Sequence, residues 1–116
     1  MAGRGESIIT LPDGEEITIL FTNQALGEFQ QRTGTAAMSL LFQAERQNIG
    51  QVEIANLLRA GMTAANHANG SRKEATSLKQ AYDIMDSVGF IPVMEVVMGA
   101  VADVLTYRGD TESDPN

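Results

Sequence analysis

Few side chains in this sequence are of the types that usually perform catalysis or hold metal ions. His67 is the single histidine and the chain contains no cysteine, so the usual zinc ligand sets cannot be assembled. His67 lies in the polar stretch AANHANG, where a solvated histidine is far more common than a general base without a partner. We therefore expect no metal site and no bound cofactor.

Asp83 and Asp86 are two carboxylates at nearby positions of one predicted helix. Such a pair can carry out acid–base chemistry or bind Mg²⁺, although a hydrated helix face is the commoner explanation. The sequence lacks the G-x-S-x-G, G-x-x-x-x-G-K-[ST] and G-x-G-x-x-G motifs, and Asp13-Gly14 lacks the ligand spacing of a calcium loop. The residue types and their spacing therefore predict a protein that is not an enzyme.

Length and charge narrow the range of partners. The chain has 116 residues, the size of one domain, with a net charge of −7 and a pI near 4.5. A negative surface repels the phosphate backbone of nucleic acids, and the only basic cluster is Arg72-Lys73 with Lys79 nearby. We therefore expect no binding to nucleic acid.

The apolar segments favour neither secretion nor membrane insertion. The N-terminal residues MAGRGESI lack the apolar core of a signal peptide. The longest apolar run, residues 90–105, contains Pro92, Glu95 and Asp103 and is shorter than the roughly 20 residues that a membrane span needs. Together with the absence of cysteine, these features favour a cytoplasmic protein without membrane contact.

The elements that must position any functional residue begin with a β-hairpin over residues 7–21. Alternating apolar and polar residues run on both sides of Pro12-Asp13-Gly14, which has the composition of a tight turn. The rest of the chain has the spacing of helices, with Thr22 or Asn23 as the first cap and Ser71 to Glu74 matching a capping box. Residues 64–70 have the composition of a loop. The predicted helices cover about 23–33, 36–46, 51–65, 72–88 and 92–106.

These elements predict a mainly α (α+β) fold, an N-terminal β-hairpin followed by a bundle of about five helices. One domain would cover residues 1–107, and the polar residues 108–116 have the composition of a disordered acidic tail. Gly99 inside the last helix predicts close helix packing, with a hinge as the weaker alternative.

The last predicted helix is apolar around most of its circumference, which is more than one buried face requires. Its surplus apolar residues can line an adaptable groove for a partner, because methionine side chains repack easily. The alternative is that this helix is the central helix of the bundle. In the groove hypothesis Met98→Asp abolishes binding and leaves a folded monomer, whereas loss of helical signal places Met98 in the core. The candidate partner-binding residues are Phe90, Met94, Val97, Met98, Val101 and Leu105.

Several local patterns occur in an order that resembles a known family. Arg4-Gly5 precedes Leu11 and Gly14 in the hairpin, and Ala25-Leu26 follows the polar cap of the first helix. Further similar patterns are Thr33-Gly34 with Leu41, the set Ile54, Leu57, Leu58, Ala60, Gly61 and Met62, and an apolar helix after Gly89. Over about residues 4–107 the chain resembles the small tail assembly chaperones of long-tailed bacteriophages, including those of prophages and gene transfer agents.

The resemblance implies a non-enzymatic assembly factor in the cytoplasm of the bacterial host. Such chaperones bind the long, aggregation-prone tape measure protein, help to recruit tail tube protein, and are not expected in the mature virion. A client with exposed apolar stripes needs a soluble, acidic partner that can shield them. In many relatives a ribosomal frameshift adds a C-terminal extension, for which the segment after Tyr107 is the expected start. Homo-oligomer formation stays open.

Two other classes of protein fit the same sequence. A structural tail component would remain in particles, although tube and completion subunits usually need more strands than one hairpin offers. A bacterial helical protein-interaction domain would also be small, acidic and free of cysteine. A long helical open reading frame downstream would favour the two phage classes, and mass spectrometry of purified particles would separate a chaperone from a structural component.

Overall fold

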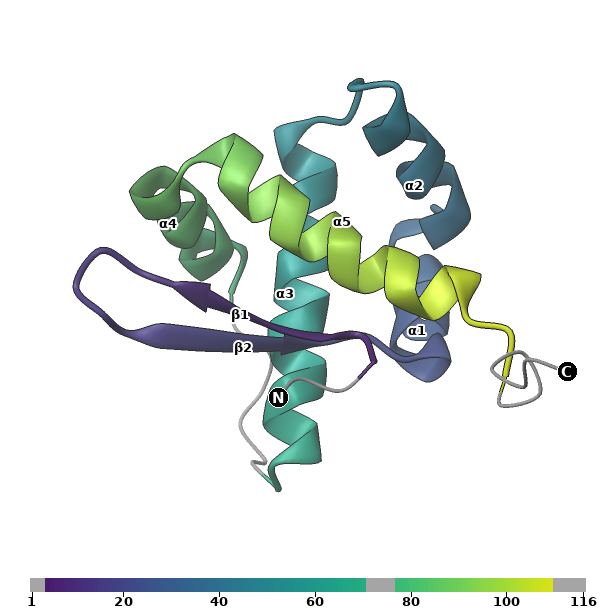
Figure 1. The fold of residues 1–116 in the computed structure, drawn as a ribbon, viewed down its shortest axis with the longest axis horizontal. Coiled ribbons are helices and arrows are strands. Elements are labelled where there is room, and N and C mark those ends of the chain that lie inside the picture. Colours follow the sequence, from purple (N-terminus) through teal and green to yellow (C-terminus); the bar gives the residue numbers. More distant parts are fainter. Residues whose placement is uncertain (1–3, 71–76, 110–116) are drawn as a thin grey trace, which may run out of the picture.

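A two-stranded antiparallel hairpin lies against five helices in the computed structural model, which describes residues 4–70 and 77–109 (Figure 1). The predicted mainly helical α+β class, with the hairpin at the N-terminus, is confirmed. One cluster of buried residues draws on both strands and all of these helices. The elements are β1 (Glu6–Thr10), β2 (Glu16–Leu20), α1 (Asn23–Thr33), α2 (Ala37–Glu45), α3 (Gln51–Ala68), α4 (Leu78–Val88) and α5 (Phe90–Thr106).

The hairpin forms where the alternation and the turn residues predict it. The backbone N–H of Gly14 donates to the carbonyl of Leu11 at 2.9 Å, and Asp13 Oδ1 accepts from the N–H of Glu15 at 2.8 Å. The register pairs Ile9 with Ile17, so these side chains share the face that meets the helices. Burial of that face fixes the register, because a slip of one residue would expose it.

Helix α3 holds the hairpin and the other helices together. It contacts β2, α1, α4 and α5, and α5 crosses it in the view of Figure 1. The close approach of β2 depends on Gly61, since a Cβ atom there would lie 2.8 Å from Phe21 Cζ and 3.0 Å from Ile19 Cβ. Both of those side chains are buried, so the absence of a side chain at Gly61 lets strand and helix meet.

Helix α5 turns back sharply from α4, with an angle of 117° between the two helices. Gly89 makes this corner with φ = 109°, a conformation that favours glycine. The helix begins at Phe90, two residues before the predicted start, and Pro92 lies in its first turn, where its missing N–H is tolerated. The helix contacts β1, α2, α3 and α4, which confirms the expectation of more than one neighbour.

Two predicted boundaries are wrong around residues 64–78. The predicted loop from residue 64 is helical as far as Ala68, because Ala65 is buried against the core and alanine favours helix. The fourth helix does not include Ser77, which is extended and caps α4 by accepting from the N–H of Gln80 at 3.1 Å. The capping box predicted at residues 71–74 lies outside the described residues, as does most of the predicted tail, residues 110–116.

Candidate functional site

The six candidate partner-binding residues of α5 do not line an open groove. Val97 and Val101 are fully buried, and 5% of Met98 is exposed. Phe90, Met94 and Leu105 are partly buried and pack against the same core. The four neighbours of α5 explain why it is apolar around most of its circumference, since the hairpin and several helices cover it from different sides.

The outward face of α5 is polar and lacks close packing. Glu95, Gly99 and Asp103 are exposed along it, one turn apart, and Ile91 is exposed in the first turn. The expected close packing at Gly99 is wrong, because a Cβ atom added there would have no non-neighbouring heavy atom within 4 Å. This face therefore offers little apolar area to a partner.

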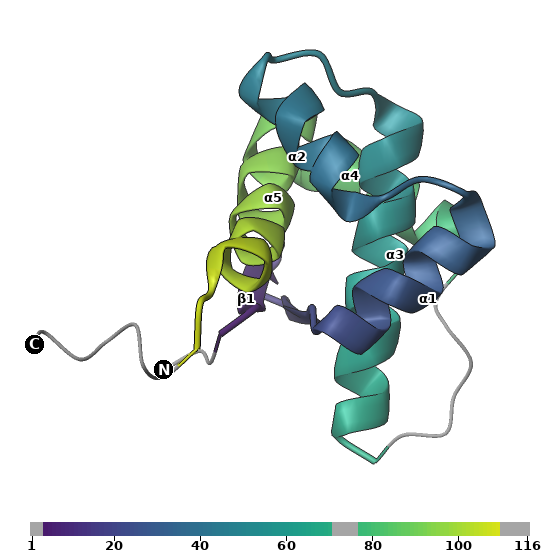
Figure 2. The same cartoon turned by 90° about the vertical axis from the view of Figure 1, so that its right-hand side faces the viewer.

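The exposed apolar side chains of α2 form a surface that is not among the six candidate partner-binding residues. Met38 is 43% exposed and Phe42 is 54% exposed, one helical turn apart, while Ala37 and Leu40 are buried. Figure 2 shows α2 at the edge of the molecule, between α5 and α3 in that view. The signal in the sequence was the short segment AMSLLFQAE, whose apolar residues exceed what one buried face needs. We call Met38 and Phe42 the α2 apolar pair.

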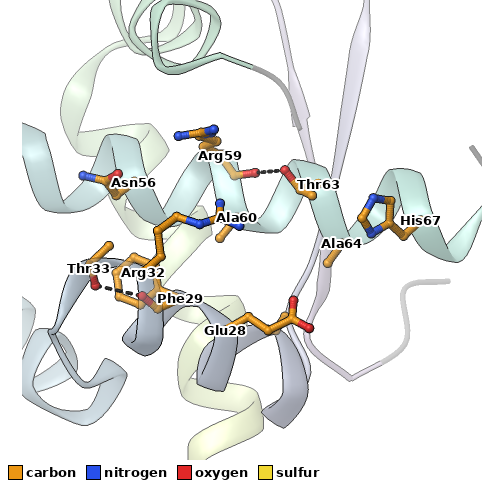
Figure 3. A pocket seen from close by; sticks show the side chains of 11 residues that line it. Glu28, Phe29, Arg32, Thr33, Asn56, Arg59, Ala60, Thr63, Ala64 and His67 are labelled. Carbon is orange, nitrogen blue, oxygen red and sulfur yellow. Dashed lines mark hydrogen bonds between the residues drawn. The ribbon is translucent and has the colours of Figure 1, made fainter. Parts of the chain in front are cut away.

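A groove runs between α1 and α3 (Figure 3). Its lining combines alanines and Phe29 with polar and charged side chains. In Figure 3 Arg32 reaches from α1 towards Ala60 of α3, and His67 lies at the far end of the groove. His67 is exposed in the last turn of α3, so its predicted place in a loop is wrong. The lining residues are Ala25, Glu28, Phe29, Arg32, Thr33, Asn56, Arg59, Ala60, Thr63, Ala64 and His67.

A second hollow continues this groove towards the start of α3. It shares Phe29, Thr33 and Asn56 with the first and extends to Leu40 and Val52. We call the two together the α1–α3 groove. A hydrogen bond holds part of its wall in place, because the side-chain amide of Asn56 donates to the backbone carbonyl of Val52 at 2.9 Å.

The acidic pair on α4 is a solvated helix face in this structure. Asp83 Oδ2 accepts a hydrogen bond from Lys79 Nζ at 3.0 Å within an ion pair, and both side chains are exposed. Asp86 is exposed as well. Within residues 4–70 and 77–109 there is no group of three or more histidine and acidic side chains placed to hold a metal ion.

Across the same described residues, no single helix is long and apolar enough to cross a bilayer, and only α4 and α5 taken together, bent at their junction, reach the required length and composition.

No family model, curated protein or solved structure matches this chain.

Proposed function

We propose that this protein is a non-enzymatic tail assembly chaperone of a long-tailed phage or gene transfer agent. In this proposal it binds the tape measure protein, aids assembly of the tail tube, acts in the cytoplasm of the bacterial host and leaves before the particle is complete. The order of the elements, a hairpin followed by helices, agrees with the order of the motifs that carry the family resemblance. A structural tail component and a helical interaction domain are the competing proposals.

The observation that carries the proposal is that several residues of the resemblance, Gly5 and Gly61 among them, occupy positions that this fold constrains sterically. Gly5 has φ = 78°, and a Cβ atom there would collide with the carbonyl oxygen of Phe21 and lie 2.8 Å from Val104 Cγ2. Gly61 lets the end of β2 approach α3. Leu57 and Leu58, from the same motif as Gly61, are fully buried. The shared patterns are thus requirements of the fold, which supports a common fold with the chaperones.

The α2 apolar pair is the contact that we assign to the client within this proposal. Met38 and Phe42 present apolar area to solvent on one helix face, whereas the large apolar residues of α5 other than the exposed Ile91 pack in or against the core. An amphipathic client helix can place its apolar stripe over such a face. The net charge of −7 would keep the resulting complex in solution.

Particle composition tests the proposal against the structural alternative. Deleting the gene from its own genome should abolish tailed particles, and the wild-type particles should contain the tape measure and tube proteins but not this chain. Quantitative mass spectrometry of purified particles gives the result. Recovery of this chain in a fixed ratio to the tube protein would make it a structural component. Normal particles from the deletion strain would contradict both phage proposals, and only the interaction-domain proposal would remain.

A further inference from the structure

The hairpin has an open strand edge that takes no part in the contact assigned to the client. In the described part of the chain the sheet has two strands, so each strand pairs on one side only. The N–H of Phe21 donates to the carbonyl of Gly5 at 2.8 Å, which fixes the side of β1 that faces β2. Backbone groups alternate between the two sides of a strand, so those of Ile8 and Thr10 point away from β2.

The outward backbone groups of β1 are free to pair with another strand. Among the residues that the structure describes, no hydrogen bond engages the N–H or the carbonyl of Ile8 or Thr10 on this side. The strand contains no proline, lysine or bulge, which are features that commonly protect an exposed edge. Such an edge is a template for a further strand.

The edge of β1 is more accessible than the edge of β2. Ile8 is 48% exposed and Thr10 is exposed too, although α5 also contacts β1. Thr18 and Leu20 of β2 are only partly exposed, and α3 packs beside that strand. Figure 1 shows the turn end of the hairpin extending past α3. We therefore place the docking edge on β1.

The charge of the hairpin indicates what kind of strand fits this edge. Residues 5–20 contain four carboxylates and no cationic side chain. Glu15 and Glu16 are exposed, and neither forms an ion pair within the described residues. Glu16 lies opposite Thr10 in the register, so its side chain shares the outer face beside the open edge. A basic strand would be attracted here, whereas a second copy would bring the same carboxylates and a net charge of −7.

We propose that β1 binds an extended basic segment of a partner protein, which joins the sheet as a third strand. The segment lies antiparallel to β1, the more stable arrangement per residue, and exchanges backbone hydrogen bonds with Ile8 and Thr10. A β-branched residue of the segment lies opposite Ile8, and a lysine or arginine opposite Thr10 extends over that threonine towards Glu16. This inference does not depend on the chaperone proposal.

Titration of the ¹⁵N-labelled full chain with three capped peptides tests the proposal. The first peptide is lysine–threonine–valine–threonine–lysine, the second has glutamate in place of lysine, and the third is the first with its backbone nitrogens methylated. Methylation keeps the charge and removes the hydrogen-bond donors. With the first peptide alone, we expect saturable amide shifts in the hairpin and slower hydrogen exchange at Ile8 and Thr10.

Four results would overturn the proposal. They are the absence of saturable shifts, equal binding of the glutamate peptide or of the methylated peptide, shifts centred on other elements, and self-association through the edge. Self-association would be recognised without peptide, because the exchange of Ile8 and Thr10 would slow as the concentration of the chain rises.

Two threonine-to-proline substitutions separate the edge of β1 from the rest of the sheet. Thr10→Pro removes one outward N–H and should raise the Kd of the lysine peptide about tenfold. Thr18→Pro is the matched control, because the N–H of Thr18 points away from β1 and its loss should leave the Kd nearly unchanged. Neither change removes a bond between β1 and β2, so both variants should fold. Equal weakening by both would refute the assigned edge.

A charge substitution gives a second test that does not require a proline in the sheet. Glu16→Gln should raise the Kd of the lysine peptide about threefold, the scale of one exposed ion pair. Glu95→Gln makes the same charge change on the exposed face of α5 and should leave the Kd nearly unchanged. Equal effects of the two substitutions would reduce binding to net charge and refute the site.

Discussion

Phe21 lies where two glycines, Gly5 and Gly61, approach it too closely for either to carry a side chain. Its backbone N–H donates to the carbonyl of Gly5 at 2.8 Å, a Cβ atom at Gly5 would collide with its carbonyl oxygen, and its ring lies against Gly61 of α3. Its side chain is 1% exposed, so the ring has little freedom to move away from either neighbour. Two glycines far apart in the sequence therefore serve one packing arrangement, which joins the hairpin to the central helix.

Gly61→Ala should lower the free energy of unfolding by about 1–3 kcal/mol, the usual cost of extra atoms in a filled core. The added methyl group would meet Ile19 Cβ at 3.0 Å, an atom too close to the backbone to swing aside. Gly99→Ala is the matched control, because its Cβ atom enters open space and alanine favours helix, so stability should rise by up to about 1 kcal/mol. Urea unfolding of both variants measures the difference, and equal stability would refute the packing assigned to Gly61.

Met98→Asp should unfold the chain rather than yield a folded monomer that cannot bind. The side chain is 5% exposed, and burying an unpaired carboxylate there costs more than about 3 kcal/mol. Met98→Leu should cost less than about 1.5 kcal/mol, because the volume is nearly conserved. Far-ultraviolet circular dichroism distinguishes the two variants. A stable, helical Met98→Asp variant would contradict the burial of Met98 in the core.

The ends of helices that depend on neighbouring residues could be predicted from the sequence. Thr22 caps α1 by accepting from the N–H of Ala25 at 3.0 Å, and Gly34 ends that helix, as the residue types predict. Predictions failed where tertiary contacts decide whether a segment is helical. Ala65 extends α3 because its side chain meets the core, which a count of polar residues in that stretch does not reveal.

The groove expected on α5 is closed for the same physical reason. A helix that is apolar around its circumference is either central or open to a partner, and the two cases have the same sequence pattern. In this molecule β1, α2, α3 and α4 all contact α5, whereas the surplus apolar residues of α2 remain exposed. The α1–α3 groove could not be predicted from the sequence either, because Arg32 and Asn56 lie on different helices and line one groove only in the folded chain.

Phe42→Ser should remove client binding while preserving stability within about 0.5 kcal/mol, since the side chain is 54% exposed. Val52→Ser is the control, because Val52 is exposed to a similar extent, at 59%, but lies in the first turn of α3. Pull-down of the tape measure protein with each variant, beside a thermal melt, gives the answer. Equal loss of binding in both variants would argue against a specific role for α2.

At the scale of the whole molecule, the structure separates a packed core from two distinct surfaces. The core contains the hairpin face and the apolar side chains of α3 and α5, and it leaves the α2 apolar pair and the α1–α3 groove exposed. An acidic chain with a small apolar surface suits a partner that is itself poorly soluble. In the chaperone proposal, this acidic domain shields part of a long client and is later displaced.

The solubility of the tape measure protein is the most direct test of that proposal. The tape measure protein from the same genome would be expressed alone and together with this chain, and its soluble fraction would be measured with an affinity pull-down of the complex. We expect the tape measure protein to move into the soluble fraction and to co-purify with the wild-type chain. A tape measure protein that stays insoluble and unbound beside a folded, abundant chain would contradict the chaperone function.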